Sequence, residues 1–142
     1  MSMPCEMNGI IGIDMAKNRF LLDTNVIIDT LNHTLDLLAF LDTFPECETY
    51  INPIVAIEVL AKTDMSEQEE ADARAILDGF KWAEIDKPTC EIAAQIRRAK
   101  ELRLPDALIA ASAIALNATV ISNDPHLRNY QHPSYTAIAA AN

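Results

Sequence analysis

Two aspartates in this sequence follow apolar runs, where a solvated surface residue is not expected. Asp23 ends the run Phe20-Leu21-Leu22, and Asp124 comes two residues after the segment TVIS. Apolar runs without polar alternation are typical of strands that are covered on both faces in a parallel sheet. Ligands of such sheets bind beyond the carboxyl ends of the strands. Both carboxylates are therefore placed to meet a ligand.

Two further acids, Glu58 and Asp106, fall within apolar helical segments. Glu58 shares a helical stripe with Ile54, Ile57 and Ala61, so we expect its side chain to be buried. Asp106 heads the segment PDALIAASAIAL, which is apolar on nearly every side and is also expected to be buried. An ionised carboxylate in such surroundings has to be paired, metal-bound or protonated.

Each aspartate also has a purely structural explanation. Asp23 could cap a helix that begins at Thr24, and Asp106 could favour the dipole of its own helix. Asp124 could open a turn ahead of Pro125. Glu58 fits this kind of explanation less well, because a glutamate in mid-helix does not cap and an apolar stripe does not solvate it. The sequence leaves both explanations open for the aspartates.

Electrostatics indicates what would join these four acids if they converge. Two carboxylates about 5 Å apart repel each other by about 3 kcal/mol at an effective dielectric constant of about 20, so a cluster of four requires a counter-charge. Hard divalent cations prefer oxygen ligands, and Mg²⁺ or Mn²⁺ suits a small carboxylate site. The histidines do not indicate zinc, because His33, His126 and His132 form no paired-ligand spacing. A converged cluster therefore predicts Mg²⁺ or Mn²⁺.

The elements that must position these acids alternate along the chain. Asn52 followed by Pro53, the Ser66/Glu69 capping box and Asn117 mark helix ends. Strands are expected at 20–23, 48–51, within 81–86 (centred on 83–85) and at 119–122, and helices at 24–31, 34–43, 53–62, 66–80, 88–103 and 105–116. Strands separated by helices predict an α/β fold of three layers, α/β/α, with a central, mostly parallel sheet.

Length and composition favour one domain that occupies residues 20–142. Residues 1–19 are expected to be an extension outside the core, and their short apolar stretch with acidic flanks fits no signal peptide. The 142-residue chain has three widely spaced cysteines and no CxxC, which is typical of a protein of the reducing cytoplasm. No apolar run approaches the roughly 18–20 residues that cross a bilayer, so no membrane association is expected.

The net charge of −10 argues at first against a nucleic-acid partner. Salt screens charges over about 8 Å, however, so a local basic surface can still bind phosphate. The sequence contains one basic run, in which four of the eleven cations lie within seven residues: Arg97, Arg98, Lys100 and Arg103. The run is either a solvated helix face or a phosphate-binding surface.

Four segments taken together resemble the PIN-domain family, in particular its small VapC-like toxins. They are DTNVIID, AIEVLAK, LPDALIAASA and ATVISND, and the similarity spans about Asn18 to Tyr130. The resemblance implies a Rossmann-like nuclease fold in which Asp23, Glu58, Asp106 and Asp124 surround Mg²⁺ or Mn²⁺. It also implies that Asn25 and Ser122 support the site.

The activity that the resemblance implies is metal-dependent cleavage of single-stranded or looped RNA by an endoribonuclease. For a small toxin it also implies a homodimer and a cognate antitoxin that occupies the groove of the site. Arg103 is a candidate for phosphate contact beside Asp106. The tail QHPSYTAIAAAN does not resemble the last strand that is usual in the family. Pro125 and His126 stand where some relatives carry further acids, which leaves the number of metal ions open.

Two other classes of function share some of these sequence features. A phosphatase of the haloacid dehalogenase kind also places an aspartate after its first strand, but its second aspartate, two residues on, is Asn25 here. A PIN-like module that binds RNA or protein without cutting is disfavoured by the presence of all four acids. The alternative to a nuclease is therefore such a non-catalytic binding module.

Overall fold

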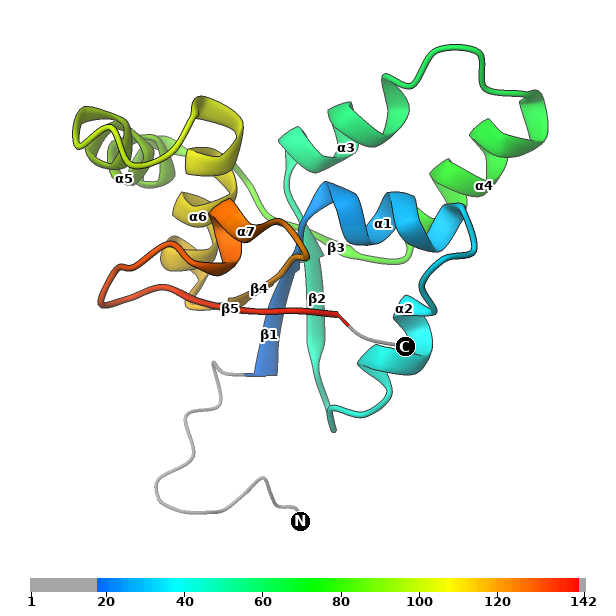
Figure 1. Cartoon of the computed structure of the whole chain (residues 1–142), viewed down its shortest axis with the longest axis horizontal. Helices are drawn as coiled ribbons and strands as arrows, with labels where there is room; N and C mark the ends of the chain where they lie inside the picture. Colours follow the sequence, from blue (N-terminus) through cyan, green and yellow to red (C-terminus); the bar gives the residue numbers. More distant parts are fainter. Residues whose placement is uncertain (1–17, 141–142) are drawn as a thin grey trace.

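The apolar run before Asp23 forms a strand at the centre of a parallel sheet, as its pattern predicts. The computed structural model describes residues 18–140. Its sheet has the order β3-β2-β1-β4-β5, and every neighbouring pair is parallel (Figure 1). The strands are β1 (Arg19–Leu22), β2 (Glu48–Ile51), β3 (Lys81–Trp82), β4 (Thr119–Ile121) and β5 (Thr136–Ile138).

Helices cover both faces of this sheet. Figure 1 shows α5 and α6 packed together on one side and α1, α3 and α4 grouped on the other. The helices are α1 (Thr24–Leu31), α2 (Leu37–Leu41), α3 (Pro53–Leu60), α4 (Glu67–Asp78), α5 (Lys87–Arg98), α6 (Leu104–Leu116) and α7 (Pro125–Arg128). The predicted three-layer α/β/α fold with a parallel sheet is confirmed.

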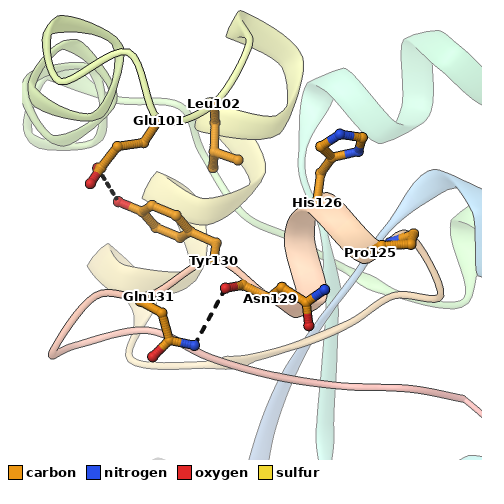
Figure 2. A pocket seen from close by; sticks show the side chains of 7 residues that line it. All are labelled: Glu101, Leu102, Pro125, His126, Asn129, Tyr130 and Gln131. Carbon is orange, nitrogen blue, oxygen red and sulfur yellow. Dashed lines mark hydrogen bonds between the residues drawn. The ribbon is translucent and has the colours of Figure 1, made fainter.

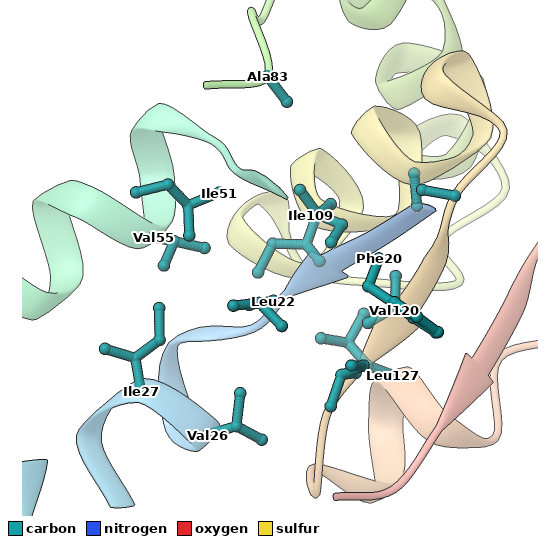
Figure 3. Packing of buried hydrophobic residues seen from close by; sticks show 14 of the residues in the cluster. Phe20, Leu22, Val26, Ile27, Ile51, Val55, Ala83, Ile109, Val120 and Leu127 are labelled. Atoms are coloured by element: carbon teal, nitrogen blue, oxygen red, sulfur yellow. The ribbon is translucent and has the colours of Figure 1, made fainter. Parts of the chain in front are cut away.

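The core lies between β1, β4 and the helices that pack on them (Figure 3). Leu22 pairs with Ile121 across the sheet, and both side chains are fully buried. Ile27 of α1 and Ile109 of α6 are also buried in this cluster. Burial of one such side chain stabilises a fold by about 1.5–3 kcal/mol, so these contacts hold the ends of β1 and β4 side by side.

Three helices begin directly after strands of the sheet, each capped by a polar side chain. Asp23 accepts the backbone N–H of Thr24 at the start of α1, and Asn52 accepts that of Val55 at the start of α3. Asp124 accepts the backbone N–H of His126 at the start of α7. Each cap satisfies a donor that the helix itself leaves unpaired. The caps therefore fix the chain where strands end and helices begin.

Several predicted boundaries move in the structure, and α2 is shorter at both ends than the predicted helix 34–43. The third strand is Lys81–Trp82, which lies within the predicted segment 81–86 but before its expected centre at 83–85, and Ala83 continues it only through one bond from its N–H to the carbonyl of Ile51. Helix α5 ends at Arg98 and not at Arg103, because Lys100 adopts a left-handed conformation with φ of 59°. That conformation reverses the chain, so Arg103 lies outside α5 while Arg97 and Arg98 stay in its last turn.

The last strand and the last helix were not predicted. Strand β5 pairs in parallel with β4, and Thr136 lies opposite Thr119. Helix α7 is a single turn that follows the cap at Asp124. A strand of three residues gives little alternation to recognise, so β5 becomes visible only through its pairing.

Part of the expected N-terminal extension, residues 1–17, lies outside the described residues. Asn18 and Arg19 are described, and Arg19 already belongs to β1. The division into an extension over 1–19 and a domain over 20–142 therefore stays a prediction. Within residues 18–140, none of the helices is both long enough and apolar enough to cross a membrane.

Candidate functional site

Asp23 is a buried carboxylate at the carboxyl end of the central strand. Its side chain is only 5% exposed. One oxygen accepts the N–H of Thr24 at 2.8 Å and the other accepts the hydroxyl of Ser122 at 2.7 Å. Burial raises the pKa of Asp23 from 3.8 to about 6, although both hydrogen bonds act in the opposite direction and Asp106 and Asp124 add a smaller increase. The side chain is thus oriented by two donors in a place that disfavours its charge.

Ser122 connects the ends of β1 and β4. Its fully buried hydroxyl donates to Asp23 and accepts the backbone N–H of Asp124 at 3.0 Å. Asn25 lies beside it, with 3.5 Å between its side-chain nitrogen and the Ser122 hydroxyl, and accepts the N–H of Asn123 at 3.3 Å. Asn25 and Ser122 therefore contact the residues around Asp23, and their supporting role in a site stays a prediction.

Asp106 lies half-buried in the first turn of α6 and faces the other acids. Its pKa is raised, first by burial and then by the charge of Asp124, with a smaller contribution from Glu58. Arg103 and His126 act in the opposite direction. Since charge interactions fall off steeply with distance, these influences agree with carboxylates that lie in the same region of the molecule.

The prediction that the Glu58 side chain is buried is wrong, because the structure leaves it exposed. Helix α3 turns Val55 and Val59 inward, whereas Ile57 on the expected stripe is 61% exposed. The carboxylate of Glu58 accepts the hydroxyl of Thr24 at 2.5 Å. Glu58 therefore lies at the solvent-facing rim of the same region, tied to the residue that follows Asp23.

The elements bring the four acids to one end of the sheet from four different places. Asp23 follows β1, Asp124 follows β4, Glu58 lies in α3 after β2, and Asp106 lies at the start of α6. Figure 1 shows the starts of α1, α3 and α6 at the upper end of the strands. This is the carboxyl end, where ligands of parallel sheets bind.

The charge of these acids is incompletely compensated by the protein. Within residues 18–140, no lysine or arginine forms an ion pair with Asp23, Glu58 or Asp106, and Asp124 approaches only His126, at 3.2 Å. Oxygen donors of this kind are those that Mg²⁺ and Mn²⁺ prefer. In the described part of the chain, however, no three His, Cys, Asp or Glu side chains are arranged closely enough to hold an ion. The donor set suits a divalent cation, while the side chains would have to turn inward to share one.

Arg103 and two other cations of the basic run line a cavity that opens beside Asp106. Arg97, Lys100 and Arg103 contribute to it, and its volume is about 490 Å³. Arg103 is exposed and occupies the N-cap position of α6 without a side-chain cap bond. Cations therefore lie next to Asp106. This position favours the hypothesis that the basic run binds phosphate over the hypothesis that it is only a solvated helix face.

Two residues of the site were not predicted from the sequence. Thr24 holds Glu58 through its hydroxyl. Asn123 receives the N–H of Ala140 on its side-chain oxygen at 3.1 Å and so ties the tail to the end of β4. The sequence places Thr24 directly after Asp23, but its hydrogen-bond partner, Glu58, lies 34 residues away along the chain. Nothing local identifies that pairing.

Comparisons with known proteins agree with this architecture. A family model described as PIN domain matches residues 20–133. A chain of the toxin–antitoxin complex from Klebsiella pneumoniae has the same fold with a TM-score of 0.68 at 25% identity, covering 82% of this chain and 94% of that one. A chain of FitAcB from Neisseria gonorrhoeae aligns with a TM-score of 0.59 at 27% identity, covering 75% and 88%.

The fold also matches a structure whose sequence is less similar to this chain. A chain of VapBC2 from Rickettsia felis, bound to a DNA fragment from its promoter, aligns with a TM-score of 0.73 at 21% identity, covering 87% of this chain and 99% of that one. No curated protein sequence matches the chain significantly. Since the family model spans well over half of the residues, the chain belongs to the PIN domain family.

Proposed function

We propose that this protein is a metal-dependent endoribonuclease and the toxin of a toxin–antitoxin pair. The observation that carries the proposal is the gathering of Asp23, Glu58, Asp106 and Asp124 at the carboxyl end of a PIN-domain sheet, with cations beside them. The similar structures from Klebsiella pneumoniae and Rickettsia felis are a toxin–antitoxin complex and a VapBC complex, which supports the same kind of system.

Asp23 is the residue on which the site would be built. Ser122 and Thr24 fix its two oxygens, so its orientation costs little when a cation arrives. Asp106, Asp124 and Glu58 are more exposed and would complete the set of oxygen ligands by turning toward it. Bound Mg²⁺ or Mn²⁺ would supply an activated water near neutral pH and neutralise charge on the scissile phosphate. No nucleophilic side chain is required.

The basic residues would hold the RNA. Lys100 and Arg103 line the cavity beside Asp106, and phosphate contacts of this kind position a nucleic acid without reading its sequence. Placing the backbone next to the acids would supply the orientation that hydrolysis needs. Single-stranded or looped RNA is the substrate class that fits, because its phosphates can bend into such a cavity.

One observation favours a second candidate, a PIN-like module that binds RNA or protein without cutting it. The carboxylates of the described residues do not form a ready cation site as they stand. A protein in which they never converge would still bind RNA through its basic cavity. The two candidates differ in turnover and not in binding.

A cleavage assay separates these candidates. Labelled RNA is incubated with the protein in Mg²⁺, in Mn²⁺ and in chelator. We expect cleavage only with metal, and a loss of about 100-fold or more for Asp23→Asn and for Asp106→Asn, because each removes charge that acts on the cation. Circular dichroism checks that both variants fold.

Asp78→Asn is the matched control for this assay, because it makes the same chemical change at an exposed position at the end of α4. Its activity should equal that of the unmodified protein. Equal cleavage by all variants would point to a contaminating nuclease, and RNA binding without turnover in any metal would establish the binding module.

We also propose that a cognate antitoxin restrains the activity and that the protein is a homodimer. The toxin–antitoxin complex from Klebsiella pneumoniae supports a protein partner. Co-expression with the product of a neighbouring short reading frame should suppress the cleavage, and light scattering measures the oligomeric state.

A further inference from the structure

Two neighbouring surface cavities share part of their lining and together form a groove with Asp106 at one end. The first, of about 490 Å³, includes Asp106. The second, of about 570 Å³, ends at Tyr130. Glu101, Leu102 and His126 line both cavities, so the two volumes adjoin. Together they are large enough for one or two nucleotides, since cavities of about 300–1,000 Å³ accommodate ligands of that size.

The end of the groove at Asp106 is basic. Arg97, Lys100 and Arg103 line it. Arg97 donates to the carbonyl of Leu102 at 3.0 Å, which holds the guanidinium group at the wall. On a chain with a net charge of −10, such a local concentration of cations suits an anionic ligand that is brought to the acids.

The far end of the groove carries an aromatic ring and two side-chain amides. Figure 2 shows Tyr130 reaching toward Glu101 across the cavity, with Asn129 and Gln131 on either side of it in the sequence. The Tyr130 hydroxyl donates to Glu101 at 3.1 Å, and its ring packs edge-on against Tyr135 with 5.1 Å between centroids. The ring is therefore held in a defined position.

The two amides differ in their internal bonding. The Gln131 amide donates to the backbone carbonyl of Asn129 at 3.3 Å. Within residues 18–140, the exposed Asn129 side chain makes no hydrogen bond to the protein. An exposed amide beside a fixed aromatic ring matches the two contacts that proteins use for an unstacked base, stacking and hydrogen bonding to its edge.

We infer that this groove binds a nucleotide flanking the scissile phosphate of RNA, with its phosphate at Lys100 and Arg103 and its base against Tyr130, where Asn129 and Gln131 read the base edge. This inference rests on the proposed function and assigns its substrate specificity to the segment after α7. It requires single-stranded or looped RNA, because bases within a duplex stay stacked on each other.

A binding experiment tests the base site without relying on cleavage. Asp23→Asn protein in chelator is titrated against a fluorescein-labelled, single-stranded RNA, and the anisotropy gives Kd. In this background, Tyr130→Phe and Tyr130→Leu both remove the hydrogen bond to Glu101 and leave an apolar side chain. Only phenylalanine keeps an aromatic ring on which a base can stack. We expect Tyr130→Leu to raise Kd about tenfold and Tyr130→Phe to change it about twofold or less. Equal Kd values for the two variants would overturn the stacking role.

Asn129→Ala covers the case in which Tyr130→Leu fails to fold. The Asn129 side chain is exposed and makes no hydrogen bond to the described part of the chain, so its replacement should leave the melting temperature unchanged and still raise Kd. Gln68→Ala is the control, because it removes an exposed side-chain amide on α4 that does not line the groove. It should leave Kd unchanged. An unchanged Kd for Asn129→Ala would place the base elsewhere.

A cleavage experiment tests the reading of the base edge. RNA with randomised positions around the cut is digested by the unmodified protein, by Asn129→Ala and by Gln131→Ala, and the products are sequenced. We expect the base preference at one flanking position to fall about fivefold or more in both variants, while the overall rate changes less. The same preference in all three proteins would refute the reading. If the unmodified protein cuts no RNA, the proposed function fails, and the Kd comparison alone decides whether the groove binds a base.

Discussion

At the scale of single residues, Asp23 combines two roles that normally exclude each other. It caps α1 through Thr24, and it presents a carboxylate to the candidate site. A cap on the surface would be solvated, but Asp23 is almost completely buried, so its charge is costly. The structural explanation of Asp23 as a helix cap is therefore confirmed, and the cost of burying its charge supports the functional explanation, which stays a prediction.

The raised pKa of Asp23 predicts a specific pH dependence of stability. Below about pH 4 the carboxyl group is protonated in both the folded and the unfolded protein, and above about pH 6 it is ionised in both. Stability is therefore lost as the pH rises from about 4 to 6, by about 3 kcal/mol for a pKa near 6 in place of 3.8. Asp23→Asn should lack this loss.

The measurement is urea unfolding of both proteins in metal-free buffer between pH 4.5 and 7.5. The stability of Asp23→Asn relative to the unmodified protein should increase with pH across this window. Added Mg²⁺ should stabilise the unmodified protein more than the variant, because a bound cation favours the ionised carboxylate. A difference that stays constant with pH would mean that the charge is compensated elsewhere.

At the scale of elements, the turn between α6 and β4 sets where Ser122 and Asp124 lie. Helix α6 ends at Asn117, which has φ of 55° and ψ of 49°, and β4 begins two residues later. This left-handed conformation costs most residues about 1–2 kcal/mol, whereas asparagine and glycine adopt it readily. A short reversal of this kind aligns β4 beside β1 without a loop.

We expect Asn117→Ala to reduce the free energy of unfolding by about 1 kcal/mol, because alanine is strained in this conformation. Asn117→Gly should change it by about 0.5 kcal/mol or less, since glycine is not strained there. Urea denaturation compares the two variants. Equal losses for alanine and glycine would show that the asparagine side chain, and not the backbone conformation, stabilises the turn.

At the scale of the whole molecule, a chain with a net charge of −10 carries a cavity lined by cations. The left-handed Lys100 follows the end of α5, and Arg103 then occupies the N-cap of α6, whose first turn contains Asp106. Acidic residues dominate α4, where Glu67, Glu69 and Glu70 occupy the first turn. The charge is thus distributed unevenly. We therefore expect a higher affinity for phosphate than the net charge of −10 alone suggests.

Lys100→Glu and Lys87→Glu test this distribution, because they change the net charge equally at opposite ends of α5. We expect Lys100→Glu to weaken binding of single-stranded RNA and to lower the slope of log K against log salt by about 0.7 or more. Lys87→Glu should leave the slope nearly unchanged. Anisotropy titrations at several salt concentrations give the slopes. The same slope for both variants would mean that net charge, and not the cavity, governs binding.

The sequence alone was enough to identify the elements other than α7 and β5, together with many of their ends. Apolar runs identified β1 and β4, and Asn52, Ser66 and Asn117 marked the helix ends that the structure contains. These signals are local, since a cap or an apolar run acts over only a few residues. The order of the four acids along the chain was visible for the same reason, although their role in catalysis stays a prediction.

Tertiary structure alone decided how these residues meet. The bond between Ser122 and Asp23 joins residues 99 positions apart, and the exposure of Glu58 depends on which face of α3 packs inward. Strand β5 exists through its pairing with β4. Such contacts arise because strand register and helix packing minimise exposed apolar area over the whole chain, and no short segment contains that information.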